Sequence, residues 1–188
     1  MRTRRVAPAV LGLDLSLKRS AACFIPAGWE LGEWGDLTFA SFPTPDVVPN
    51  LSVEEAQVAR MKRIDHVAER VVDFATNRCE PTHVRVEEFG FSKHSTSVTA
   101  LGELRGVVRQ EVWRATGKMM VPITVSAARR LLLGHLPRKD AKVLVQQALY
   151  KHGAPFDDDD QCDAFCVANA GLAELGLIAV TLATRLAG

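Results

Sequence analysis

One carboxylate lies inside an apolar segment near the start of the chain. The segment VLGLDLSLKRSAACFIP spans residues 10–26, and its apolar run at residues 9–15 predicts a buried strand. Asp14 is the only acidic residue of this segment. Burial strips water from a carboxylate, so a charged aspartate in a strand needs hydrogen bonds or a cation to compensate. We therefore expect Asp14 either to bind amides of the following turn or to have a functional role.

The rest of the chain predicts an alternation of strands and helices. Glycine-interrupted sequence over residues 23–42 predicts two more strands in an antiparallel meander, and 83–89 and 120–125 predict two further strands. Ser52 predicts the N-cap of a long helix that ends near Phe74. Further helices are predicted over 97–115, 126–134 and 139–152, and from the aspartate run to Leu172. This order predicts an α/β fold with a mixed five-stranded sheet and helices on both faces.

Apolar residues at helical spacing predict which side of each helix faces the core. From the helix at 139–152 we expect three residues to face inward, Val143, Val145 and Leu149. The stripe of the long helix comprises Val58, Met61, Ile64, Val67, Val71 and Phe74, and that of the helix at 97–115 comprises Val98, Leu101, Leu104, Val108 and Val112.

Length, composition and cysteine spacing suit a single intracellular domain. A chain of 188 residues with 47% hydrophobic residues can bury a sizeable core, and we expect one domain over 1–188. No apolar run approaches the roughly 20 residues of a membrane-spanning helix, and MRTRR leads into a strand pattern and not into a signal-peptide core. We therefore expect a soluble cytoplasmic protein, of a prokaryotic cell or a virus-infected host. The cysteines lack metal-binding spacing, and we expect buried free thiols at Cys23, Cys79, Cys162 and Cys166.

Charge is balanced over the chain but unevenly distributed along it. The 23 basic and 22 acidic residues give a net charge of +1, so composition alone does not indicate a nucleic-acid-binding protein. Basic residues gather at the N-terminus and over residues 129–142, whereas acids gather at residues 157–160. A uniformly solvated surface would mix the signs more evenly.

Four acids are distinguished by where they fall in the predicted elements. Asp14 lies in the first strand and Glu87 near the end of the strand at 83–89, and Asp160 and Asp163 lie three residues apart on the last helix. Acids that converge repel each other and lose hydration, so they persist together only with a cation between them. A pair of Mg²⁺ ions would neutralise them and activate a water for attack at phosphorus, which is what a nuclease requires. The alternative is that the DDDD run only complements the dipole at a helix N-terminus.

Two of these positions have an acidic neighbour that competes for the role. Adjacent strand residues point to opposite faces, so only one of Glu87 and Glu88 can face the cluster. Asp159 and Asp163 are four residues apart and also share a helical face, so Asp159 is an alternative to Asp160.

Four segments together resemble the RuvC family of Holliday junction resolvases, in the RNase H-like superfamily. They are VLGLDLSLKRSAACF, HVRVEEFGFSKHSTSVTALGELRGVVRQEV, SAARRLLLGHLPRKDAKVLVQQAL and DDDDQCDAFCVANAG, and the similarity runs from about residue 9 to 174. The resemblance implies an RNase H-like fold and a catalytic, metal-binding tetrad of Asp14, Glu87, Asp160 and Asp163, with Glu88 outside it. It implies a magnesium-dependent endodeoxyribonuclease with two Mg²⁺ ions per active site, for which Mn²⁺ can substitute. The implied reaction resolves four-way DNA junctions by paired symmetric nicks, in recombination and repair.

The resemblance also implies contacts with the DNA backbone. Lys142 matches a position where the family has a basic residue near the phosphates. Further candidates for binding DNA are Lys93, Arg129, Arg130 and Lys139. An ordinary solvated helix face is the alternative for these residues.

An aromatic residue and a partner subunit are the remaining implications of the resemblance. The family stacks an aromatic side chain at the junction crossover, and here Phe91 is the first candidate and Phe89 the second, because the matching offset holds Gly90. A two-fold symmetric junction implies a homodimer, with no role for a membrane. The helix at 97–115, with Trp113, is the candidate dimer interface.

Three other functions are compatible with parts of the pattern. An actin-like kinase opens with a similar strand, but it needs two such domains, and 188 residues leave no room for the second. A catalytically silent RNase H-like scaffold that only binds nucleic acid would have lost members of the tetrad, yet all four positions carry acids. A nuclease that cuts flaps or other branched DNA would have the same active site, because the selectivity for four-way junctions lies in dimer geometry.

Overall fold

The sheet has five strands and mixes antiparallel with parallel pairing. The computed structural model describes residues 7–46, 48–88, 95–135, 137, 139–177 and 181–182. The strands are β1 (Val10–Asp14), β2 (Arg19–Ile25), β3 (Thr38–Pro43), β4 (His83–Glu87) and β5 (Met120–Ile123). They lie in the order β3-β2-β1-β4-β5, in which β1, β2 and β3 form the predicted antiparallel meander and β4 and β5 run parallel to β1. The second strand begins at Arg19, four residues before the predicted segment.

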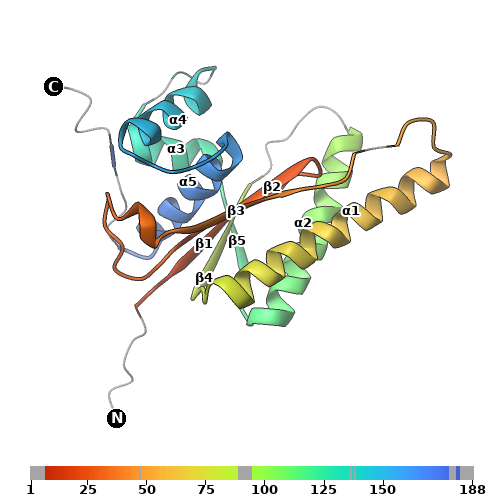
Figure 1. Ribbon diagram of the computed structural model, residues 1–188, viewed down its shortest axis with the longest axis horizontal. Coiled ribbons are helices and arrows are strands. Elements are labelled where there is room, and N and C mark those ends of the chain that lie inside the picture. The colour runs from red at the N-terminus through yellow and green to blue at the C-terminus, as the bar shows by residue number, and fades with distance from the viewer. Residues whose placement is uncertain are drawn as a thin grey trace, which may run out of the picture.

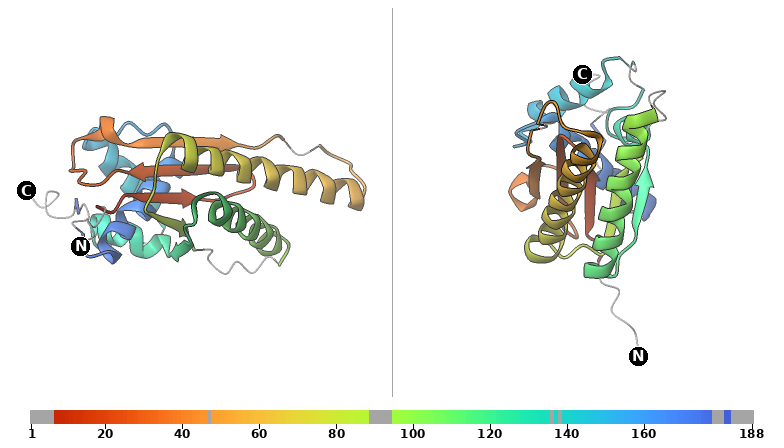
Figure 2. Two further views of the ribbon diagram at one scale, coloured as in Figure 1. Left: turned by 90° about the horizontal axis from the view of Figure 1, so that it is seen from below. Right: turned by 90° about the vertical axis from the view of Figure 1, so that its right-hand side faces the viewer.

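Helices cover both faces of this sheet (Figures 1 and 2). One face carries α1 (Val53–Asp73), which continues into a π-helical turn (Phe74–Arg78), and α2 (Ser95–Thr116). The other face carries α3 (Val125–Leu133), α4 (Ala141–Lys151) and α5 (Asp159–Glu174). The predicted α/β fold class, with a mixed five-stranded sheet between helices, is confirmed. Within the described ranges, no helix combines the length and apolarity needed to cross a membrane.

The pleat of the strands divides the core in two. In β1, Leu11 and Leu13 pack with α1 and α2, whereas Val10 packs with α3, α4 and α5. In β2, Ala22 belongs to the first cluster and Cys23 to the second. This alternation follows from the two-residue period of a strand, so consecutive residues serve opposite faces.

The N-terminus of α1 is the one that Ser52 predicts. The Ser52 side chain accepts a hydrogen bond from the Glu55 N–H, and the Glu55 carboxylate accepts one from the Ser52 N–H, which completes a capping box. The predicted inward stripe is wrong for the first half of this helix, because Val58 and Met61 are 50% and 45% exposed. This half of α1 reaches past the sheet, so no strand lies beneath it (Figure 1).

Two further stripe residues also face solvent. Val143 of α4 is 53% exposed, and Val98 of α2 is 37% exposed, whereas Val145 and Leu149 are fully buried as predicted. Both exposed valines lie within four residues of the start of their helices. Val143 is two residues from Val145 and so lies on the opposite side of α4, and the prediction that both face inward is wrong for that reason. Val98 lies on the predicted side of α2, but the helical period does not give how far the neighbouring sheet extends along the helix.

All four cysteines are buried free thiols, as predicted. Burial raises the pKa of the Cys79 and Cys162 thiols to about 12. Burial also raises the pKa of Cys23 and Cys166. Thiols kept protonated in this way are inert packing groups.

Candidate active site

Asp14 and Glu87 are the last residues of two neighbouring parallel strands. The pairing of β1 with β4 sets Leu13 beside Val86, so the acids that follow lie next to each other. Their side chains share a hydrogen bond on the sheet face that α5 covers. Glu88, by contrast, is exposed, and its N–H donates to the Ile123 carbonyl at 2.7 Å. Strand alternation thus turns Glu87 toward the cluster and Glu88 away from it.

A glycine in β1 lets α5 approach the sheet closely. A Cβ atom at Gly12 would lie 2.2 Å from the Ala164 carbonyl oxygen and 2.5 Å from the Ala168 nitrogen. The main chain of α5 therefore rests directly on the main chain of β1. Because Asp163 precedes Ala164 and Asp14 lies two residues after Gly12, this contact brings the two acids together.

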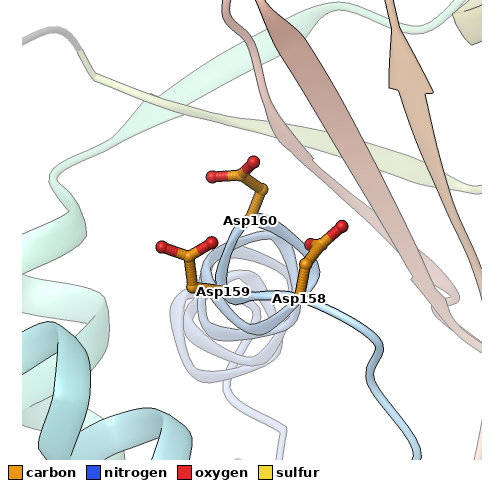
Figure 3. A group of neighbouring side chains, drawn as sticks. All are labelled: Asp158, Asp159 and Asp160. Carbon is orange, nitrogen blue, oxygen red and sulfur yellow. The ribbon is translucent and has the colours of Figure 1, made fainter.

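The aspartate run forms the N-terminus of α5. Figure 3 shows the carboxylates of Asp158, Asp159 and Asp160 fanning out from the first turn, and one oxygen of each lies within 4.8 Å of the others. Asp158 is the N-cap: it accepts from the Gln161 N–H at 2.8 Å and from the Ser41 hydroxyl at 2.7 Å. The role of helix capping, expected as the alternative for the whole run, therefore falls to Asp158.

Electrostatics link Asp160 and Asp163 to the strand acids. Burial raises the pKa of Asp14 well above its ordinary 3.8, and the charges of Glu87, Asp163 and Asp160 raise it further. Burial likewise raises the pKa of Glu87, while its hydrogen bond with Asp14 opposes the shift. Four acids from β1, β4 and α5 thus act on one another across a half-buried site. The charge of Asp160 on Asp14 favours Asp160 over Asp159 in the open choice between them.

Basic side chains lie among these acids. The Lys142 ammonium is 2.9 Å from Asp159, 3.4 Å from Asp160 and 3.3 Å from Asp163. Burial opposes its charge, but the hydrogen bond with Asp159 and the charge of Asp163 raise the pKa of Lys142 overall. The Arg129 guanidinium donates two parallel hydrogen bonds to the Asp163 carboxylate, at 2.9 and 2.7 Å. Two of the predicted basic residues are therefore part of the acidic site itself.

Arg19 also contacts the site, although the sequence reasoning missed it. Its Nε donates to Asp160 at 2.7 Å, and Nη2 lies 3.4 Å from Asp159. Arg19 begins β2 two residues before Ala21, which pairs with Asp14, so both side chains point to the same face. The strand register would have identified it, but register is not visible in the sequence.

The remaining predicted residues lie apart from the acids or outside the described chain. Arg130 on α3 and Lys139 before α4 are exposed, and in the part of the chain that the structure describes neither forms an ion pair with the acids. Phe91, its alternative Phe89, and Lys93 lie outside the described residues.

The donor set suits a hard divalent cation. Carboxylate oxygens are the ligands that Mg²⁺ prefers, and acids that raise each other's pKa are stabilised by a positive charge placed between them. Lys142 already supplies such a charge with one ammonium group in contact with three carboxylates. The residues present therefore fit a metal site of Asp14, Glu87, Asp160 and Asp163.

Comparison with solved structures gives the fold a name. The structure is similar to that of T. thermophilus RuvC in complex with a Holliday junction substrate, with a TM-score of 0.63 and 19% identity over 90% of this chain and 96% of that one. It is also similar to the Fowlpox virus resolvase in complex with Holliday junction DNA, with a TM-score of 0.50 and 10% identity over 89% of this chain and 98% of the other. The yeast mitochondrial Holliday junction resolvase matches with a TM-score of 0.50 and 12% identity, over 88% of this chain and 78% of that one.

These similarities establish the RNase H-like α/β fold that the sequence predicts. The chain shares this fold with RuvC and other Holliday junction resolvases. At the level of sequence, no protein-family model and no curated protein matches the chain.

Proposed function

We propose that the chain is a metal-dependent endodeoxyribonuclease that resolves four-way DNA junctions by paired symmetric nicks. The observation that carries the proposal is the convergence of Asp14, Glu87, Asp160 and Asp163 from two strands and one helix. The fold shared with junction resolvases supports the choice of substrate.

The four acids would hold two Mg²⁺ ions, with Mn²⁺ as a substitute. Such a pair would supply an activated water and electrostatic stabilisation for a displacement at phosphorus. Asp14 and Glu87, which interact most strongly with each other, would both serve as ligands in their deprotonated forms. Lys142, which contacts two of these acids, would be placed to bind a DNA phosphate beside them. Arg129 keeps Asp163 in place through its two parallel hydrogen bonds.

A homodimer would give two such sites for the two strands that are cut. Trp113 of α2 is 53% exposed, and Val121 of the edge strand β5 is 39% exposed. The exposed Trp113 supports α2 as the interface, because a large aromatic side chain left in solvent favours burial against a partner. Sedimentation equilibrium at micromolar concentration should give a dimer mass, and Trp113→Glu should shift it to the monomer.

Cleavage of four DNA substrates tests the function. A synthetic four-way junction, a flap, a duplex and a single strand are incubated with wild type or Asp14→Asn, in Mg²⁺ or EDTA. We expect symmetric, Mg²⁺-dependent nicks in the junction that are absent with the variant. Equal cutting of all branched substrates would replace the resolvase with a broader branched-DNA nuclease, and binding without cutting in any metal would indicate a silent scaffold.

A further inference from the structure

A groove opens directly beside the acids on the β2 side of the site. Its volume is about 780 Å³, and it runs between the turn that joins β1 to β2, the residues that follow β3, and α1. Asp159 and Asp160 are among the residues that line it. Among the described residues, three cationic side chains, Lys18, Arg19 and Arg63, also line the groove, together with Asp46.

The wall of the groove is a rigid turn. Arg63 of α1 donates to the Leu17 carbonyl and, at 3.1 Å, to the Thr44 hydroxyl, which ties the β1–β2 turn and the end of β3 to the helix. The Thr44 N–H donates to the Lys18 carbonyl at 3.1 Å, and the Ser16 hydroxyl donates to the Arg19 carbonyl at 2.8 Å. The backbone that carries Lys18 is therefore held from both sides before any ligand arrives.

Lys18 and Arg19 differ in how accessible their charged groups are to a ligand. The Arg19 guanidinium is engaged with Asp160 and Asp159. Lys18 is exposed at the groove. An exposed lysine on a fixed turn, next to acids that repel phosphate, supplies a positive charge where an approaching polyanion needs it.

We propose that this groove is a phosphate subsite for the DNA strand beside the scissile bond, and that Lys18 contacts its backbone. The inference rests on the proposed function and extends it. Asp159 and Asp160 line the same groove as Lys18, so a strand with its scissile phosphate at the acids passes within reach of the turn that Arg63 holds in place for Lys18. The contact is with phosphate, so it adds affinity without reading the base sequence.

Salt-dependent binding tests the subsite separately from cutting. Fluorescence anisotropy measures the affinity of a labelled four-way junction for Asp14→Asn, alone and combined with Lys18→Ala or with Lys118→Ala, from about 50 to 200 mM salt. Lys118 is an exposed lysine that precedes β5, at the opposite end of the parallel strands from Asp14, and serves as the matched control. We expect Lys18→Ala to reduce the slope of log affinity against log salt by about one unit, and Lys118→Ala to leave it unchanged.

Uncharged methylphosphonate linkages locate the contact. Placed one at a time around the cleavage point, one of them should weaken binding by Asp14→Asn several-fold and have no further effect once Lys18 is alanine. An unchanged slope with Lys18→Ala, or no linkage whose effect depends on Lys18, overturns the subsite. If the wild type cuts no DNA, the proposed function fails, yet the same slopes on duplex and single-stranded DNA still test the groove. Absence of binding to any DNA overturns both.

Discussion

The two faces of the sheet use the same strands for different purposes. Under α1 and α2, the strands contribute Leu13, Val84 and Val86, which are fully buried. Under α5, the neighbouring positions contribute Asp14 and Glu87, whose raised pKa values show that burial disfavours their charged forms. Both faces carry a hydrophobic core, but the face under α5, the charged face, places acids among its apolar residues, whereas the strand residues of the face under α1 and α2, the apolar face, only pack. Because the pleat separates the two sets, substitutions one residue apart should have opposite effects.

The largest expected effect is on cutting, from the charged face. Asp14→Asn keeps the shape of the side chain but removes its charge, so cleavage should fall about a thousandfold or more, roughly 4 kcal/mol of transition-state stabilisation. Folding and junction binding should persist. Single-turnover cleavage measures the loss, and Glu88→Gln, at the exposed neighbour of Glu87, is the control that should keep wild-type rates. Full activity in Asp14→Asn would remove this residue from the mechanism.

The apolar face should show the reverse pattern. Leu13→Ala removes a fully buried side chain next to Asp14 and should cost about 2–5 kcal/mol of unfolding free energy. Cutting by the protein that remains folded should stay near the wild-type rate. Urea unfolding and cleavage at low temperature measure the two quantities, and a variant that stays stable but loses activity would contradict the division between the faces.

The substitution Gly12→Ala should lower both the free energy of unfolding and the rate of cutting. Its added methyl group would press on the main chain of α5 and should cost about 1–3 kcal/mol. Cutting should also fall, although no charge has changed, because α5 carries Asp160 and Asp163. Gly106→Ala on α2 is the control: its Cβ meets nothing within 4 Å, so it should stabilise the helix by roughly 0.5–1 kcal/mol. If the Gly12 and Gly106 variants had equal stability and equal cutting rates, the contact between the main chains of β1 and α5 would not position the acids.

The smallest expected effect is on the pH dependence of stability. The folded protein holds protons on Asp14 and Glu87 more tightly than the unfolded chain, whose pKa values are near 3.8 and 4.5. The resulting stabilisation is complete below about pH 4 and is lost as the pH rises through the raised folded values. Between about pH 4 and 7 the wild type in EDTA should therefore lose stability relative to Asp14→Asn.

Urea unfolding in EDTA at each pH measures this difference. Mg²⁺ added at pH 7 should raise the melting temperature of the wild type and not that of the variant. If the unfolding free energies of wild type and Asp14→Asn changed in parallel with pH, the buried charge of Asp14 would not destabilise the folded protein.

Much of the fold could be predicted because its signals are local. The capping box at Ser52 and Glu55 and the alternation around Glu87 and Glu88 each depend on residues within a few positions of one another. Those signals gave the element order, the fold class and the acids that the structure brings together.

The features that could not be predicted from the sequence depend on contacts between distant parts of the chain. Arg19 reaches Asp160 from 141 residues away, and that contact depends on how β2 aligns with β1. Val58 and Val98 lie on the predicted sides of their helices but are partly exposed to solvent, because burial depends on how far the neighbouring elements extend. Helical and strand periods describe single elements, whereas these features depend on how two elements pack against each other.

The contact at Gly12 has a consequence for how such proteins diverge. The distance between β1 and α5 is set by two backbones, so the side chains of the surrounding core can be exchanged without moving the acids. Identities of 10–19% alongside a shared fold are what such freedom permits. In this architecture relatives are therefore easier to recognise by structural similarity than by sequence similarity.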